Sequence, residues 1–366
     1  MKVPFFNYPA LFAAHRREYL EIIEQVLARG AYIMQRELFE FEAALAAYLG
    51  VKHAVGLADG TMALMIGLRA AGVKAGDEVI VPSHTFVASA AAIQHAGATP
   101  VLADCGADHL IDAKSVRKLI TSRTKAIMPV QLNGRTCDMD AIDAVAKEHR
   151  LQIVEDSCQA LGSKFKGRFA GTFGAAGAFS FYPSKTLGCF GDGGALVTDD
   201  DAIAEAARVM RDHGRSATGE VIAWGYNSRL DNLQAAVLLA KLKRYEAEIT
   251  RRRELAARYR DRLQSISQLV LPPGPQQADH FDVYQNYEIE AERRDELRAH
   301  LTQAGVGTIL QWSGFMIHQH RALGLKGDWA NTEKLSTRYL LLPMNTALSD
   351  EDVDFVCDAI TRFYRK

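Results

Sequence analysis

The first two thirds of the chain alternate short apolar runs with segments of helical length. The seven runs, each of five or six residues, cover positions 53–58, 78–82, 99–103, 125–130, 151–155, 176–181 and 194–198. Between them lie helix-like segments such as 61–72 and 138–149. Strands that alternate with helices of this length form βαβ units around a mostly parallel sheet, so we expect an α/β fold.

The two ends of the chain have different patterns. Amphipathic helices are expected before the first strand, at 14–29 and 37–49. The Pro/Gly stretch 271–277 interrupts the last third, which predicts a smaller α+β domain. Its expected elements are one long helix or two in series over 229–264, a strand at 284–290, and helices at 293–305 and 350–364. We therefore expect a large domain over 1–245 and a small one over 246–366. The boundary is not sharp, because the long helical segment could belong to either domain.

Charge and cysteine usage exclude several classes of protein. The 366 residues carry 43 Lys+Arg against 44 Asp+Glu, whereas a general nucleic-acid binder needs a basic surface. No apolar stretch approaches the roughly 18 residues of a transmembrane helix, and we expect neither a membrane span nor a secretory signal. The five cysteines are scattered and form no CxxC pair, which indicates reduced thiols in the cytoplasm and no metal site.

Two ionisable residues that could react with or bind a ligand follow apolar runs. Lys185 comes after run 176–181 and precedes the glycine-rich stretch 188–194. A lysine in an apolar setting loses its proton more easily and becomes a nucleophile toward aldehydes. Asp156 follows run 151–155, where a helix cap is the ordinary role. Its alternative role is to hold a positive charge on a ligand.

Two further strand ends carry groups that suit a flat, phosphorylated ligand. Asp59, Gly60 and Thr61 open a helix, and helix N-termini bind phosphate through free N–H groups. Phe86 follows run 78–82 and could stack on a planar heterocycle, although core packing is the common fate of a single Phe. A nucleophilic lysine, a carboxylate, a phosphate-binding helix start and a stacking ring are together what pyridoxal phosphate requires.

Three segments carry a resemblance to a known family. VEDSCQALGS (154–163), SFYPSKTLGCFGDGGALVT (180–198) and GYNSRLDNLQAAVL (225–238) resemble the DegT/DnrJ/EryC1/StrS family of pyridoxal-phosphate aminotransferases. The resemblance implies fold type I, with a mainly parallel seven-stranded sheet in the large domain. It also implies a homodimer whose active sites lie at the subunit interface.

The family's cofactor-binding positions can be carried over to this chain. Lys185 matches the lysine that bonds the cofactor covalently, and Asp156 matches the partner of the pyridine nitrogen. Phe86 takes the stacking position, and Gln159 lies where the family places a side chain near the ring hydroxyl. The remaining implied contacts are to the phosphate, from Gly60, Thr61 and Ser180 and, from the other subunit, Asn227.

The resemblance also implies the substrates. L-glutamate is the family's usual donor and leaves as 2-oxoglutarate, and a nucleotide-linked keto sugar is the acceptor, for amino-sugar, O-antigen and lipopolysaccharide synthesis. The stretches around 188–195 and 227–236 look most like members that aminate a 3-keto sugar, in which Arg229 would bind the sugar's acidic group. Trp312 and His318 are candidate sugar contacts, although the family's His-Tyr-Pro run is missing here.

Several alternatives stay open at this point. Within the family, the chain could aminate C4 of a 4-keto-6-deoxy sugar, or make a cyclitol or an aminobenzoate. Related sugar dehydratases replace the cofactor-binding lysine by His, and Lys185 argues against that class. A regulatory protein that had lost catalysis would have no chemical reason to keep Lys185, Asp156, Thr61 and Ser180 together.

Overall fold

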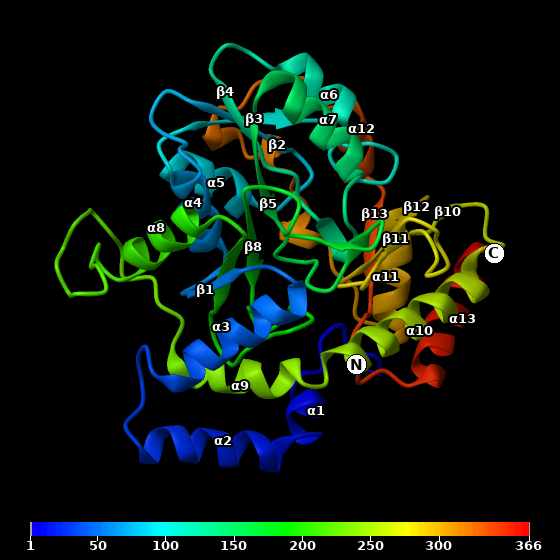
Figure 1. Ribbon diagram of the computed structural model, residues 1–366. Helices are drawn as coiled ribbons and strands as arrows, with labels where there is room; N and C mark the ends of the chain where they lie inside the picture. The colour runs from blue at the N-terminus through cyan, green and yellow to red at the C-terminus, as the bar shows by residue number, and fades with distance from the viewer. Residues whose placement is uncertain (1, 366) are drawn as a thin grey trace.

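A seven-stranded, mainly parallel sheet forms the centre of the protein, as the sequence predicted (Figure 1). The computed structural model describes residues 2–365. The strands are β1 (His53–Leu57), β2 (Glu78–Pro82), β3 (Thr99–Ala103), β4 (Thr124–Ile127), β5 (Gln152–Asp156), β8 (Ala176–Ser180) and β9 (Gly194–Thr198). They lie in the order β1-β9-β8-β5-β4-β2-β3, and β9 runs antiparallel to both of its neighbours. The α/β prediction is therefore confirmed.

Helices pack on both faces of this sheet. They are α3 (Arg36–Leu49), α4 (Gly60–Ala70), α5 (Val87–His95), α6 (Ala113–Leu119), α7 (Met139–His149), α8 (Asp201–Arg211) and α9 (Asn232–Leu242). Successive strand residues point to opposite faces, so Ala178 joins the core under α4, α5 and α7 while Phe179 joins the core under α3 and α9. Burial on both faces explains why the strands read as continuous apolar runs.

The helix starts and stops follow local chemistry. The Asp59 side chain accepts a hydrogen bond from the Met62 N–H (2.8 Å) and so caps α4. Gly50 ends α3 in the left-handed conformation (φ 69°), which costs glycine little. These two caps place the start of α4 directly after β1, at the edge of the sheet where the chemistry was expected.

The remaining elements flank the large sheet or build the small domain. The segment expected as one helix or two is two, because α9 is followed by a separate helix that starts at Tyr245. A three-stranded antiparallel sheet, β10-β12-β13, shares one core with helices on the right of Figure 1. The elements are α1 (Tyr8–Ala13), α2 (Arg16–Ala28), β6 (Lys164–Phe165), β7 (Arg168–Phe169), α10 (Tyr245–Leu263), β10 (Leu269–Val270), β11 (His280–Phe281), β12 (Tyr287–Ala291), α11 (Arg294–Ala304), α12 (Ala330–Ser336), β13 (Tyr339–Leu342) and α13 (Asp350–Tyr364).

Helix α10 connects the two cores. Its first turns, with Tyr245 and Ile249, pack into the core of the large sheet, whereas Leu255 and Leu263 pack into the small domain's core. Val3, at the other end of the chain, also belongs to the small core. The division at residues 245 and 246 stays a prediction, and the packing shows that both ends of the chain contribute to the small domain.

Several classes of feature are missing from residues 2–365. None of the helices there is both long and apolar enough to cross a membrane. The same residues contain no cluster of three or more His, Cys, Asp or Glu arranged to hold a metal ion. All five cysteines are free thiols.

Candidate active site

Several of the predicted cofactor-binding residues gather at one edge of the large sheet. β1, β2, β5 and β8 are parallel, so their carboxyl ends lie at the same edge, where open α/β sheets bind ligands. This edge carries Gly60, Phe86, Asp156 and Ser180, and the turn after β8 brings Lys185 back over it.

Lys185 lies in an environment that favours its neutral form. Burial lowers the pKa of its amine, while the Cys158 thiol and the Asp156 carboxylate nearby oppose that shift. Its backbone N–H donates to the Tyr182 carbonyl (2.8 Å), which holds the turn in place. An amine with a lowered pKa is a better nucleophile and proton acceptor near neutral pH.

Asp156 is almost fully buried and is held by two donors. The Ser89 hydroxyl donates to its Oδ2 (2.7 Å), and the Cys158 N–H donates to its Oδ1 (3.2 Å). Ser89 is in turn hydrogen-bonded to Thr85 (3.0 Å), so the loop after β2 and the start of α5 orient the carboxylate. Sequence reasoning missed Ser89, because only the fold brings α5 against the end of β5.

Gly60, Ser180 and Cys158 form a tight cradle at the start of α4. A Cβ on Gly60 would lie 2.7 Å from the Cys158 sulfur and 2.9 Å from the Ser180 Cβ. Any side chain at Gly60 would therefore displace its neighbours. The first N–H groups of a helix have no partner within it, and Asp59 takes up that of Met62, so those of Gly60 and Thr61 face outward for an anion.

Phe86 and Gln159 follow the carboxyl ends of two strands, β2 and β5 respectively. Phe86 is 49% exposed, although the strand before it is buried. An exposed ring beside buried strand ends suits stacking on a flat ligand. The Gln159 carbonyl accepts a hydrogen bond from the Asn133 N–H (2.9 Å), a contact that no sequence signal indicated.

Asn227 and Arg229 lie at the base of the segment that follows α8. The Arg229 guanidinium donates to Asp212 Oδ1 (2.7 Å) and to Asn227 Oδ1 (2.8 Å), and its Nε has no partner among residues 2–365. Within that part of the chain, no hydrogen bond or ion pair joins either residue to Lys185 or Asp156. Neither side chain is therefore connected to this chain's own site by a hydrogen bond or an ion pair.

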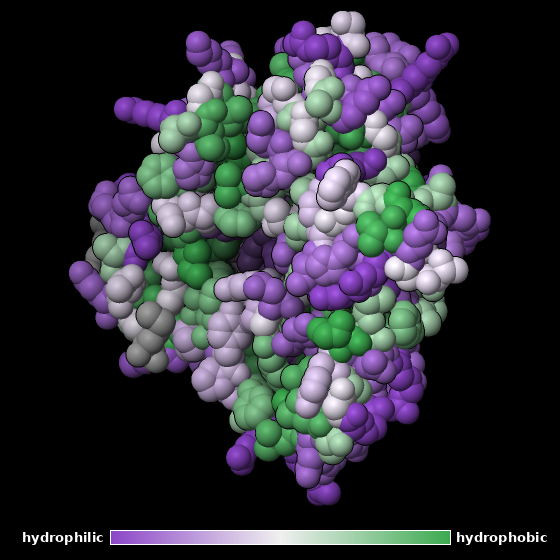
Figure 2. All heavy atoms as spheres, turned by 90° about the vertical axis from the view of Figure 1, so that its left-hand side faces the viewer, coloured by the Kyte–Doolittle hydropathy of each residue, from purple (hydrophilic) through white to green (hydrophobic). Residues whose placement is uncertain are grey.

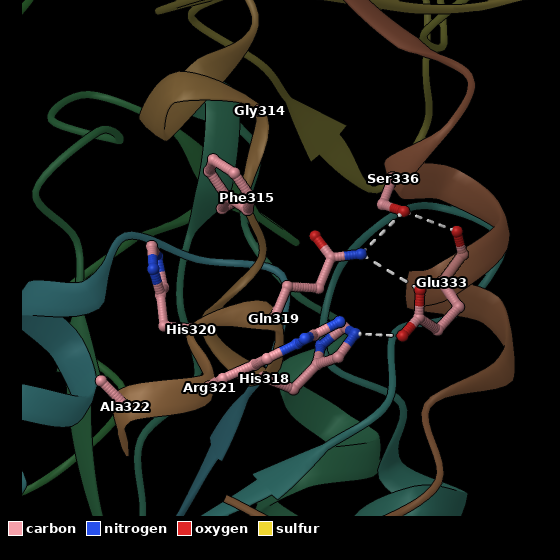
Figure 3. A pocket seen from close by; sticks show the side chains of 9 residues that line it. All are labelled: Gly314, Phe315, His318, Gln319, His320, Arg321, Ala322, Glu333 and Ser336. Atoms are coloured by element: carbon pink, nitrogen blue, oxygen red, sulfur yellow. Dashed lines mark hydrogen bonds and ion pairs between the residues drawn. The ribbon is translucent and has the colours of Figure 1, made fainter. Parts of the chain in front are cut away.

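Trp312 and His318 lie against the loop after β2, on a segment from the small domain. The Trp312 ring packs edge-on against His84 (5.5 Å between centroids). His318 is hydrogen-bonded to the Ser83 hydroxyl (2.6 Å) and to Glu333 (2.8 Å), and it lines a cavity of about 880 Å³. Figure 3 shows His318 and Gln319 both turned toward Glu333. His318 therefore fixes the segment, and its sugar contact stays a prediction.

A buried charged cluster joins the small domain to the loop that follows β3. His109 is hydrogen-bonded to Glu288 (2.8 Å) and to Glu290 (3.2 Å) of β12. Burial alone would lower the pKa of His109, but the two carboxylates outweigh burial and raise that pKa to about 10. His109 is thus a cation between two anions at neutral pH, and it stabilises the contact between the domains.

The variant His109→Gln is expected to lose about 3 kcal/mol of unfolding free energy at neutral pH, because it leaves a buried carboxylate without its cation. Since folding raises this pKa from 6.5 to about 10, the stabilisation is complete below pH 6.5 and disappears as the pH rises through 10. Denaturant unfolding across this range should show the two proteins converging. His149→Gln, at a more exposed histidine outside the cluster, is the control, and an equal loss there would contradict the assignment.

The side chains at this edge fit pyridoxal phosphate. The edge offers a buried amine for the aldehyde, a carboxylate for the ring nitrogen, an exposed aromatic face and free N–H groups for the phosphate. The space beside Gly60 is too tight for a side chain, which keeps the helix N-terminus open to a ligand. When bound, this cofactor stores an amino group and accepts the electrons that C–H cleavage releases.

Comparison with known proteins agrees with this chemistry. Residues 14–361 match the DegT/DnrJ/EryC1/StrS aminotransferase family. The chain is 40% identical over 364 residues to a dTDP-3-amino-3,4,6-trideoxy-alpha-D-glucose transaminase from Streptomyces venezuelae, which covers 98% of this chain and 95% of that protein. It is 37% identical over 340 residues to a UDP-2-acetamido-2-deoxy-3-oxo-D-glucuronate aminotransferase from Pseudomonas aeruginosa, which covers 93% of this chain and 94% of that one.

A solved structure extends the comparison to the cofactor. The crystal structure of NtdA from Bacillus subtilis with bound cofactor PMP superposes on this chain with a TM-score of 0.89 at 28% identity. The match covers 99% of this chain and 83% of NtdA. The chain therefore belongs to the DegT/DnrJ/EryC1/StrS aminotransferase family, and the cofactor of its active site is pyridoxal phosphate.

Proposed function

We propose that this protein transfers an amino group from L-glutamate to a nucleotide-linked 3-keto hexose, releasing 2-oxoglutarate and a 3-amino sugar for polysaccharide synthesis. The observation that carries the proposal is the pairing of Lys185 and Asp156 at the ligand-binding edge of the sheet. Both relatives described above are named for sugars with an amino or oxo group at C3. Five free thiols also suit a reducing cytoplasm.

Different residues of this chain perform the proton transfer, the protonation of the ring and the binding of the phosphate. The Lys185 amine, with its lowered pKa, takes the proton from the donor's α-carbon and later returns one to the sugar carbon. The Asp156 carboxylate, held by Ser89 and the Cys158 N–H, would accept a hydrogen bond from the ring nitrogen and so keep a proton on it. The N–H groups at the start of α4, with the Ser180 hydroxyl, would hold the phosphate and so fix the position of the ring.

The sugar's identity can be tested directly. Purified protein converted to its amine form with glutamate is mixed with UDP-, GDP- or dTDP-linked sugars carrying a keto group at C3 or at C4. We expect the visible band of the lysine-bound cofactor, near about 420 nm, to return with a 3-keto sugar and to stay absent with the 4-keto series. Return of the band with a 4-keto-6-deoxy sugar would move the amination to C4. A protein that never shows the band would be a regulatory relative without catalysis.

The proposal includes a homodimer with shared sites. Large apolar side chains are exposed on the loop between α2 and α3 and on the segment after α8, namely Tyr32 (55%), Val221 (63%), Ile222 (59%) and Trp224 (93%). Both segments lie on the left of Figure 1, and Figure 2 shows hydrophobic side chains around a hollow on that face. Exposed apolar groups of this size favour burial against a partner. A second copy would receive Asn227 and Arg229 from the same segment.

Mixed dimers test whether the sites are shared. Lys185→Ala and Arg229→Ala chains are each expected to be nearly inactive alone. If Arg229 serves the partner's site, mixed dimers contain one complete site, and random mixing should restore about a quarter of wild-type activity. If Arg229 serves its own chain, every site in the mixture lacks one residue, and mixing restores nothing. A protein that stays monomeric in light scattering would contradict the shared site altogether.

A further inference from the structure

The Gln159 amide is held in one orientation by a network that crosses from the large to the small domain. Its Oε1 accepts from the backbone N–H of Asn133 (2.9 Å) and from Asn286 Nδ2 (3.4 Å). Two donors on one side identify that atom as the carbonyl oxygen, so the NH2 group faces the other way. No residue within 2–365 accepts a hydrogen bond from Gln159 Nε2. Its donors are therefore available to a ligand.

The turn that supplies this N–H is itself held in an uncommon conformation. Asn133 adopts φ +56° and ψ 14°, a left-handed conformation that Asn tolerates better than most residues. The following residue, Gly134, packs so closely on the backbone of 284–285 that a Cβ there would lie 2.6 Å from the Gln285 nitrogen. The backbone N–H of Asn133 points at Gln159 because of this geometry.

The small domain secures the turn through side-chain amides. Asn133 Oδ1 accepts from Asn286 Nδ2 (2.9 Å) and from Gln311 Nε2 (2.8 Å). Gln311 also donates to the buried Glu288 (3.2 Å), the carboxylate that holds His109. Gln311 starts the segment in which the family's His-Tyr-Pro run is missing, and both acceptors of its Nε2 lie inside the protein.

We propose that Asn133, Asn286 and Gln311 are positioning residues that fix Gln159 as a hydrogen-bond donor to the cofactor ring, so that docking of the small domain tunes the cofactor. This inference rests on the proposed cofactor contact of Gln159. A donor aimed at a ring oxygen favours its deprotonated form, so loss of the alignment should change both cofactor affinity and the pH at which the visible band appears.

The test measures the dissociation constant of pyridoxal phosphate and the pH midpoint of the visible band for single and double variants. Gln159→Ala and Asn286→Ala should each weaken cofactor binding about tenfold and displace the midpoint in the same direction. In the Gln159→Ala background, Asn286→Ala should have no further effect on either quantity, because it acts only through Gln159. Additive effects in the double variant would overturn the proposal.

Two more variants separate positioning from general loss of structure. Asn133→Gly keeps the left-handed conformation but removes the Oδ1 acceptor, and it should reproduce Asn286→Ala. Asn345→Ala removes another buried amide of the small domain, which donates to the Phe5 carbonyl (3.0 Å), and should leave affinity and midpoint unchanged. If Gln159→Ala has no effect, the proposed cofactor contact is wrong. If only Gln159→Ala has an effect, the contact stands and the positioning network is refuted.

Discussion

Lys185→Ala is expected to reduce turnover by a factor of at least about 10⁴ while the chain stays folded. The amine is the only ionisable group on the turn after β8 that the structure places beside Asp156 and Cys158 within residues 2–365. In the proposed function, its removal takes away both the covalent bond to the cofactor and the base that moves the proton. Steady-state kinetics with glutamate and the absorbance near about 420 nm measure the two losses separately.

Lys241 supplies a matched control for this variant. It is also a partly buried lysine, and burial lowers its pKa to about 8. Its amine donates to the Gly188 carbonyl (2.5 Å) and lies over the Phe190 ring (4.8 Å), and within residues 2–365 no hydrogen bond or ion pair joins it to Asp156. Lys241→Ala should keep the visible band and lose less than about tenfold in turnover. Loss of the band in Lys241→Ala with full activity in Lys185→Ala would reverse the assignment.

The positions of Lys185 and Asp156 were predictable because they depend on local sequence. Asp156 directly follows one apolar run and Lys185 lies four residues after another, and parallel strands bring their carboxyl ends together whatever the details of packing. The helix start at Gly60 was predictable for the same reason. The residues that orient these groups were not predictable. Ser89 reaches Asp156 only once α5 packs against β5, and no pattern in the chain marks that contact.

The small domain's share of the site depends on contacts over still longer distances in the sequence. Gln311 meets Asn133 across 178 residues, and Glu288 meets His109 across 179. Such pairs arise from the docking of two separately packed cores, whose geometry leaves no periodic signal in either segment. The missing His-Tyr-Pro run indicated that this region differs, but only the structure shows that Gln311 is a buried structural amide.

Asp156→Asn is expected to lower turnover about 1,000-fold, equivalent to about 4 kcal/mol of transition-state stabilisation. Asparagine has nearly the same shape, and its carbonyl can still accept from the Ser89 hydroxyl or the Cys158 N–H. It cannot supply the negative charge that, in the proposed function, keeps a proton on the ring nitrogen. The visible band should therefore persist, because Lys185 is untouched, while the single-turnover rate with glutamate falls. Ser89→Ala removes one of the two donors that orient the carboxylate and should cost only about tenfold. If Asp156→Asn turned over as fast as Ser89→Ala, the charge of Asp156 would have no role in the reaction.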